Sequence, residues 1–463
     1  MISEDGVAST TERRRERVAG SEKKASQEGG SRGKSKSEIT LARERDCDAN
    51  RTYRRSKEAA MLLHAPAREL TRPASQFERV SFTCSASGIS PKNPTPPLKD
   101  ELGSELEELS IDVNPDDVRW NETVKNIIKE VCFLKGLKVL KLYLPEVALL
   151  NEFNQNEISF RSLSSFNFVV GAHLKHIISR FRHETTFEFK KQKRCLKYVN
   201  GEDIPVEIKE VLRHATALFL DRHLALTKLS EFGIENMKEL EVCVLGECKE
   251  IQTLVDGAEI NKQEDNAGDV NEETVLGSLR YLSIHYLKNL RSILKGPVQK
   301  GCLSSLKSLA LHTCPQLMTV FTWDLLENIN ILEELVIDNC PKIISLVTHE
   351  LPAEERQLCS IEHLPKLKKI SLHYMHELIS ISSGLRIAPK VEWMSFYGCP
   401  NLKTLSPMDV SSSNLKGIIG EVDWWNELTW DVQKENLDSI FVPIKGATEL
   451  MNQMAEIGDQ LQH

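Results

Sequence analysis

The sequence predicts an α/β repeat solenoid, in which short strands form one parallel sheet and helical or irregular segments return along the other face. Three observations predict this fold. The pattern L-x-x-L-x-L-x-x-(C/N)-x-x-L recurs about 11–12 times after residue 100. Its copies are evenly spaced: Ile284 and Leu311 are 27 residues apart, and Leu372 and Phe396 are 24 apart. Within each copy the x-L-x-L-x core alternates with period two, which is the period of a strand.

This spacing matches the period of about 20–29 residues that is typical of leucine-rich repeats. One coil cannot bury its own apolar face, so neighbouring coils must stack. We therefore expect a leucine-rich-repeat horseshoe over residues 103–430, with the parallel sheet on its concave face and a helical or irregular convex face. Polar insertions are expected near 256–274 and 348–358, because the repeat spacing lengthens there to 39 and 35 residues.

The segments that flank the repeats have a different character. Residues 1–100 hold 20 Lys and Arg against 14 Asp and Glu, a net charge of +6, whereas the remainder carries −14. Residues 1–102 are rich in Ser, Arg and Pro and lack periodic apolar residues, so we expect a disordered segment and linker. We interpret its charge as that of a solvated tail and expect no nucleic-acid partner.

Residues 117–137, within the first coils, are predicted to form an amphipathic helix. Residues 431–463 are expected to form a C-terminal cap and tail, with helical periodicity near 447–461.

Four cysteines recur at one position of the repeat: Cys248, Cys314, Cys340 and Cys399. A tetrahedral zinc site needs four converging ligands, whereas each coil supplies one thiol at this position. We therefore interpret these cysteines as buried structural residues. The sequence has no G-x-S-x-G, H-E-x-x-H or kinase signature, and Glu28 stands where a phosphate-binding loop would need glycine. The sequence predicts no enzymatic activity, metal or cofactor.

The outward positions of the strands form the candidate binding surface, because they need not be apolar for folding. In adjacent coils these positions align into columns that bring aromatic side chains beside histidines. Aromatic side chains with a polar tip are enriched in binding hot spots. The alternative is that they pack against each other along the sheet. The residues expected to contact a partner are Tyr281, His285, Tyr286, His312, Asp338, Lys369, His373, Tyr374, Trp393 and Tyr397.

Several local motifs resemble a known family. The C-P-x-L/I motif occurs at Cys314–Leu317, Cys340–Ile343 and Cys399–Leu402, and GCPNLKTL and DWWNELTW stand at 398–405 and 423–430. Together they resemble the leucine-rich repeats of plant nucleotide-binding leucine-rich-repeat disease resistance proteins of the coiled-coil type. The resemblance implies a recognition role, with a pathogen effector, a guarded host protein or a nucleotide-binding receptor domain in trans as the partner. It does not extend to a nucleotide-binding domain, whose motifs this sequence lacks.

The sequence therefore predicts a non-enzymatic protein-recognition module in plant defence that binds through its concave face. One alternative is a leucine-rich-repeat substrate adaptor of a ubiquitin ligase, although residues 1–100 lack the apolar pattern of an F-box. Another is a truncated receptor paralogue that does not signal. No stretch reaches the roughly 18 apolar residues needed to span a bilayer, and the N-terminus has no secretory signal. We expect a cytoplasmic or nucleo-cytoplasmic protein without a membrane span.

Overall fold

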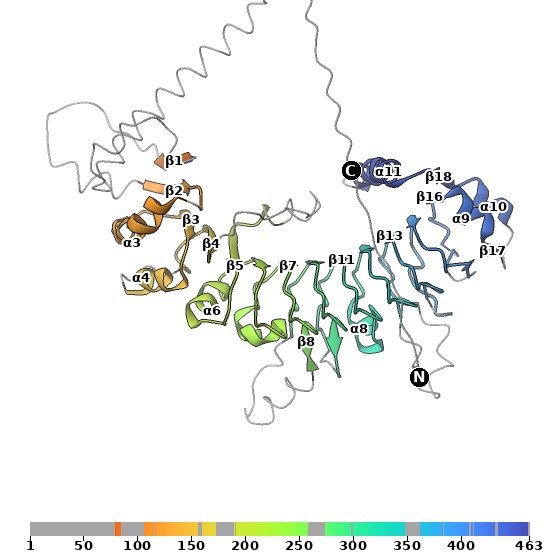
Figure 1. Ribbon diagram of the computed structural model, residues 1–463, viewed down its shortest axis with the longest axis horizontal. Helices are drawn as coiled ribbons and strands as arrows, with labels where there is room; N and C mark the ends of the chain where they lie inside the picture. The colour runs from red at the N-terminus through yellow and green to blue at the C-terminus, as the bar shows by residue number, and fades with distance from the viewer. Residues whose placement is uncertain are drawn as a thin grey trace, which may run out of the picture. The chain divides into compact units, whose positions relative to one another are not determined.

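The computed structural model shows the repeat region and both of its ends (Figure 1). All of the described residues lie in one compact unit, Arg55–His463. They are residues 79–84, 106–115, 117–155, 160–172, 189, 191–257, 274–297, 300–347, 362–382, 384–406, 409–410, 412–430 and 434–461.

The described residues form one sheet of 14 strands whose spatial order follows the sequence. Only β1 and β2 pair antiparallel, and every later pair is parallel. The strands of this sheet are β1 (Arg79–Cys84), β2 (Leu106–Asp112), β3 (Val139–Leu144), β4 (Ser165–Val170), β5 (Arg194–Val199), β6 (Ala217–Asp221), β7 (Val242–Gly246), β9 (Tyr281–His285), β11 (Ser308–His312), β12 (Glu334–Asp338), β13 (Lys369–His373), β14 (Trp393–Tyr397), β16 (Gly417–Glu421) and β18 (Phe441–Ile444). Two short parallel pairs lie outside it: β10 (Leu294–Lys295) with β8 (Val255–Asp256), and β15 (Thr404–Leu405) with β17 (Thr429–Trp430).

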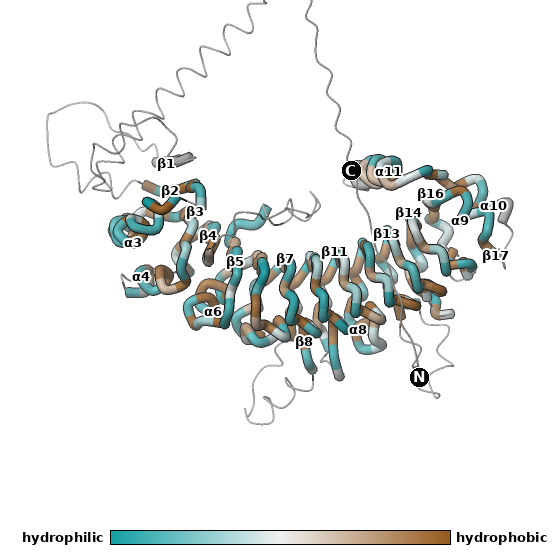
Figure 2. Tube along the Cα trace, in the orientation of Figure 1, coloured by the Kyte–Doolittle hydropathy of each residue, from teal (hydrophilic) through white to brown (hydrophobic). Residues whose placement is uncertain are grey.

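The leucines of the repeat form the core, as their period-two spacing predicts. In β11, Leu309 and Leu311 are buried and stand in register with Leu335 and Ile337 of β12. Burying one such side chain stabilises the fold by roughly 1.5–3 kcal/mol. One hydrophobic cluster runs continuously through the coils from Leu106 to Leu437. Figure 2 shows hydrophobic and hydrophilic stretches alternating along successive coils.

Helices connect or follow the strands of the sheet. The α-helices are α3 (Val118–Cys132), α4 (Leu150–Gln155), α6 (Val206–Leu212), α8 (Trp323–Asn328), α9 (Val422–Glu427), α10 (Lys434–Asp438) and α11 (Ala447–Leu461), and the 3₁₀ helices are η1 (Val147–Leu149), η2 (Leu229–Phe232) and η3 (Ile234–Asn236). In Figure 1, α3, α4, α6 and α8 lie on the convex side of the sheet, whereas α11 lies on its concave side.

Helix α3 confirms the amphipathic helix predicted within residues 117–137. The Asp117 side chain accepts a hydrogen bond from the Arg119 backbone N–H and so caps the first turn. One stripe of the helix is buried, formed by Trp120, Val124, Ile128 and Val131. Their spacing of three or four residues places them on one helix face, which covers the first coils.

The two ends of the sheet extend beyond the predicted solenoid. Strand β1 lies inside residues 1–102, which were expected to be disordered, and β18 lies beyond residue 430, where we placed the end of the repeats. Strand β18 pairs in parallel with β16, and its Pro443 is tolerated because this is the last strand of the sheet. The rest of residues 1–102 and most of the two predicted insertions lie outside the described residues.

Candidate protein-interaction surface

In the main sheet, each strand from β9 to β14 is followed by a residue in the left-handed backbone region. These residues are Tyr286, Thr313, Asn339, Tyr374 and Gly398, with φ between 54° and 63°. Their backbone N–H groups form a regular ladder: Tyr286 donates to the His312 carbonyl at 2.9 Å, and Tyr374 donates to the Tyr397 carbonyl at 2.6 Å. The ladder turns the chain out of each strand at the same point, so these side chains line one rim of the sheet.

Gly398 occupies a position of this rim where a side chain would be crowded. A Cβ atom there would lie 3.2 Å from the Tyr374 ring. Glycine also adopts the left-handed conformation without steric cost. The close approach of this backbone supports the Tyr374 ring at the rim.

The column of last strand residues forms as predicted: His285, His312, Asp338, His373 and Tyr397 stand in register. The rings of His285 and His312 stack, with centroids 4.6 Å apart and planes 13° apart. His312 Nδ1 lies 3.6 Å from an Asp338 carboxylate oxygen. These polar side chains therefore contact one another along the sheet.

The column of first strand residues is also in register, from Tyr281 through Ser308, Glu334 and Lys369 to Trp393. The Lys369 ammonium lies 2.9 Å from a Glu334 carboxylate oxygen, and the Ser308 hydroxyl donates to the same carboxylate at 3.2 Å. The charges of this column are thus paired across adjacent strands.

Four of the ten predicted contact residues are buried, contrary to the expectation that outward positions are accessible. The side chains of His285, His312, Lys369 and His373 belong to residues that are 1–6% exposed. Parallel strands lie about 4.8 Å apart, so side chains at equivalent positions cover each other. His373 also hydrogen-bonds to the Ser395 hydroxyl at 2.9 Å. These four side chains therefore lie beneath the accessible surface and contribute almost no exposed area to it.

The accessible part of the surface centres on Tyr374, which is 38% exposed. Its ring packs edge to face on Tyr397, with centroids 5.2 Å apart. Partial burial, together with Tyr397 and Asp338, raises the pKa of the Tyr374 phenol. The phenol is therefore protonated and can donate a hydrogen bond at neutral pH. Tyr281 and Tyr286 are half-buried along the same face and add further aromatic area.

Two elements of the chain itself cover parts of the concave face, and the sequence did not predict either contact. Phe189 packs beside Phe219, in a small apolar cluster with the outward residues of β5–β7. Helix α11 buries Leu450, Met454 and Ile457 in a second cluster, which includes Trp393 and Tyr397. The helical periodicity of residues 447–461 indicated an apolar helix face but not the surface that it covers.

A cavity of about 540 Å³ lies beside Gly398, between the last coils. Charged side chains line it, including Lys403, Glu421, Asp423, Glu427 and Lys445. Glu421 accepts a hydrogen bond from the Gly398 N–H at 2.8 Å, and the Lys403 ammonium lies 2.6 Å from a Glu427 carboxylate oxygen. The Trp424 side chain also lines the cavity. Gly398 both lines this cavity and belongs to the rim, so the cavity adjoins the rim.

The four cysteines of the repeat lie in the core. Cys248, Cys314, Cys340 and Cys399 are buried free thiols. Each donates to the carbonyl two residues before it, at 3.4–3.8 Å. Burial raises the pKa of Cys248 to about 12 and that of Cys399 to about 11. In the part of the chain that the structure describes, no three His, Cys, Asp or Glu side chains are grouped so that they could hold a metal ion.

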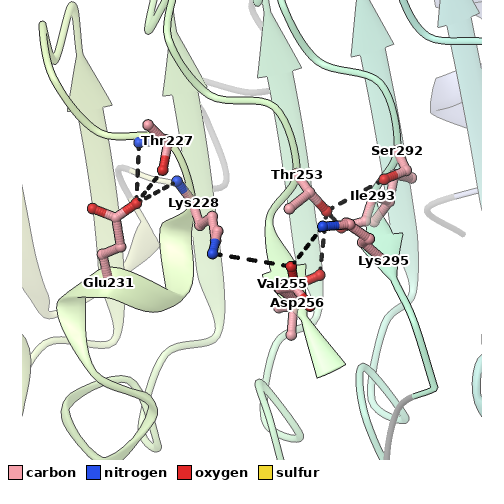
Figure 3. A network of polar contacts seen from close by, with 9 residues as sticks. All are labelled: Thr227, Lys228, Glu231, Thr253, Val255, Asp256, Ser292, Ile293 and Lys295. Carbon is pink, nitrogen blue, oxygen red and sulfur yellow. Dashed lines mark hydrogen bonds and ion pairs between the residues drawn. The ribbon is translucent and has the colours of Figure 1, made fainter. Parts of the chain in front are cut away.

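A polar network around β8 joins neighbouring coils away from the concave face (Figure 3). Asp256 is 4% exposed and lies 3.0 Å from the Lys295 ammonium and 4.0 Å from the Lys228 ammonium. Glu231 in turn accepts a hydrogen bond from the Lys228 backbone N–H. The network fixes the residue at which the predicted insertion 256–274 begins, so we assign it a structural role.

Stacked coils with one strand each, a buried apolar ladder and a recurring cysteine define a leucine-rich-repeat solenoid. Residues 218–341 and 297–417 match the family model "Plant disease resistance protein RPS2-like, leucine-rich repeats". The resemblance predicted from the sequence is therefore confirmed: these are leucine-rich repeats similar to those of plant disease resistance proteins.

The chain is also similar to one plant protein and to one solved domain. The chain is 24% identical over 335 residues to Disease resistance protein At4g27190 of Arabidopsis thaliana, an alignment that covers 70% of this chain and 31% of that protein. The chain thus spans about a third of the length of this relative. The leucine-rich repeat domain of the type III effector XCV3220 (XopL) aligns with a TM-score of 0.36 and 14% identity, over 71% of this chain and 86% of that one. None of the described helices combines the length and the apolar character that crossing a membrane requires.

Proposed function

We propose that this protein is a non-enzymatic recognition module in plant defence, which binds a pathogen effector or a guarded host protein through its concave face. The observation that carries the proposal is the exposed Tyr374 ring on the rim of the sheet, with the half-buried Tyr286 on the same rim. The Tyr374 ring is held on Tyr397 by a regular backbone ladder, so little side-chain freedom is lost on binding. The similarity to plant disease resistance proteins supports the defence role.

The proposal includes the kind of partner and the compartment. The partner is a protein, because a rigid, extended face with tyrosines and paired charges is typical of protein interfaces. A nucleotide-binding receptor domain supplied in trans is the alternative partner. The setting is the cytoplasm, where such a receptor domain would meet the repeats.

The test compares two double variants of the full chain in a pull-down from plant tissue. Tyr286→Ala/Tyr374→Ala removes aromatic area from the rim. Met318→Ala/Ile379→Ala removes apolar side chains that are 62% and 57% exposed but lie outside the strands. Replacing a hot-spot tyrosine by alanine weakens the binding free energy by about 2 kcal/mol or more. We therefore expect the rim variant to retain at least about tenfold less partner than the wild type.

Circular dichroism checks that both variants keep the wild-type fold. The proposal holds if the folded rim variant loses a protein that the control variant retains. It is wrong if both variants retain the same proteins as the wild type, because the rim is then not the binding site.

A further inference from the structure

Helix α11 packs on the concave face and is not part of the main core. Leu450, Met454 and Ile457 form a separate cluster with Ile419 and Ile444, the outward residues of β16 and β18. None of these residues belongs to the continuous cluster that fills the coils. Helix α11 therefore contributes no buried side chain to the main core.

Helix α11 presents one apolar stripe to the sheet. Its buried residues are spaced i, i+4 and i+7, whereas Met451 on another face is 67% exposed. Met454 Sδ also accepts a hydrogen bond from the Ser371 hydroxyl at 3.9 Å, which reaches β13. An isolated helix of 15 residues is marginal in water. The helix therefore depends on this one apolar stripe for its folded, docked state.

The surface under α11 is continuous with the exposed rim. Trp393 and Tyr397 pack against the α11 cluster, and Tyr397 also contacts Tyr374 edge to face. A partner that covers Tyr374 and extends along the same strands therefore meets α11. Figure 1 shows this helix above the concave side of the last strands.

We propose that the concave face of β13, β14, β16 and β18 is a helix-binding surface. In the free protein α11 fills it, and in a complex it takes an amphipathic helix of the partner with large apolar side chains at i, i+4 and i+7. This inference rests on the proposed recognition function and names the element that the partner presents. Recognition of a helix in a groove uses the same spacing of anchors.

Helix α11 competes with any external helix for this surface. A helix tethered by a short turn has an effective concentration of about millimolar, so it competes strongly with a helix added in trans. The apparent affinity for an external helix falls in proportion to the undocked fraction. Releasing α11 therefore increases binding without adding any contact.

The probe is a fluorescent peptide with the sequence of residues 445–461, titrated into full-length chains and followed by anisotropy. Leu450→Asp/Ile457→Asp weakens α11 in cis and leaves the sheet surface intact. We expect this variant to bind the peptide at least about tenfold more tightly than the wild type. A peptide with the same two substitutions is the matched control and is expected to bind neither chain.

A second variant holds the helix in place. Ser371→Cys/Met454→Cys places one thiol on β13 and one on α11, at residues linked by the contact from the Ser371 hydroxyl to Met454 Sδ. After oxidation, mass spectrometry selects the chains in which the disulfide has closed. We expect this form to bind no peptide, and reduction of the disulfide to restore binding. The proposal is wrong if the Asp variant binds no better than the wild type, or if the verified disulfide form and its reduced form bind the peptide equally.

These readouts do not require the natural partner. Failure of the rim experiment in plant tissue would refute the recognition function and leave the peptide result intact. Failure of the peptide experiment would refute the helix-binding surface alone. Thermal unfolding controls for the fold, since the residues changed in the Asp variant lie outside the main core.

Discussion

Equivalent strand positions have different surroundings in different coils. His285 and Tyr397 are equivalent in register, yet His285 is 1% exposed and stacks on His312, whereas Tyr397 is half-buried and contacts Tyr374. The difference comes from the neighbours, because each side chain is covered by the next one along the column. A residue at an outward position is therefore a binding candidate only where its column leaves it open.

The buried cysteines lead to a prediction at the scale of single residues. Burial raises the pKa of Cys248 to about 12 and of Cys399 to about 11, above the unfolded value of about 8.5. Because the folded pKa is raised, the stability contributed by each neutral thiol is complete below pH 8.5. It is lost as the pH rises through 11–12.

We therefore expect both thiols to resist iodoacetamide at pH 8 in the folded chain, since the thiolate is the reactive form. Mass spectrometry of tryptic peptides measures the extent of alkylation, with the chain in guanidinium chloride as the control. Native alkylation of either residue within tenfold of the denatured rate would contradict the structural role.

The strand-ending turns lead to a prediction at the scale of elements. Thr313 has φ 56°, a conformation that costs an L-residue roughly 1–2 kcal/mol and is worst for β-branched side chains. Asn339 occupies the same position one coil later, and asparagine tolerates this conformation better. Thr313→Asn is expected to raise the free energy of unfolding by about 1 kcal/mol, measured by denaturant titration.

The reverse change, Asn339→Thr, is the matched control and is expected to lower the free energy of unfolding by a similar amount. The hydrogen bond from Asn339 Nδ2 to Thr313 Oγ1 at 3.3 Å can re-form with an asparagine oxygen at residue 313. If both changes shift stability in the same direction, backbone strain is not what distinguishes these positions.

The elements with the strongest periodicity were predictable from the sequence. The alternation around Leu309 and Leu311 determines which residues face inward, and the cysteine position determines where each strand ends, so the register of β9–β14 is confirmed. Strand β18 was not predicted, because Phe441–Ile444 contains Pro443 and has no neighbouring repeat motif. Its strand conformation depends on pairing with β16, which is tertiary information.

The candidate surface was less predictable than the fold. The sequence placed Trp393 and Tyr397 on the concave face, which is confirmed, but it did not indicate that α11 packs on them. An amphipathic helix at 447–461 must bury one face, yet its own sequence does not specify against what. The burial of Lys369 likewise depends on Glu334 in the preceding coil.

At the scale of the whole molecule, the fold is a one-dimensional stack. Each strand of the main sheet pairs only with the strands beside it, and the core is continuous through all of the coils. Stability in such an array is approximately a sum of coil terms and nearest-neighbour interface terms. Damage in one coil should therefore weaken its neighbours most and distant coils least.

Leu311→Ala tests this expectation, because Leu311 is fully buried in the middle of the stack. Removing a buried leucine side chain typically costs about 2–5 kcal/mol. Hydrogen exchange should then show the largest loss of protection in β9, β11 and β12, and a much smaller loss in β3 and β16. Met318→Ala in the same coil is the control, since Met318 is 62% exposed and its loss should leave exchange unchanged. Uniform loss of protection along the sheet would mean that the stack unfolds as one unit, so that a partner bound at the rim could stabilise every coil equally. A local loss would confine that stabilisation to the coils beneath the partner.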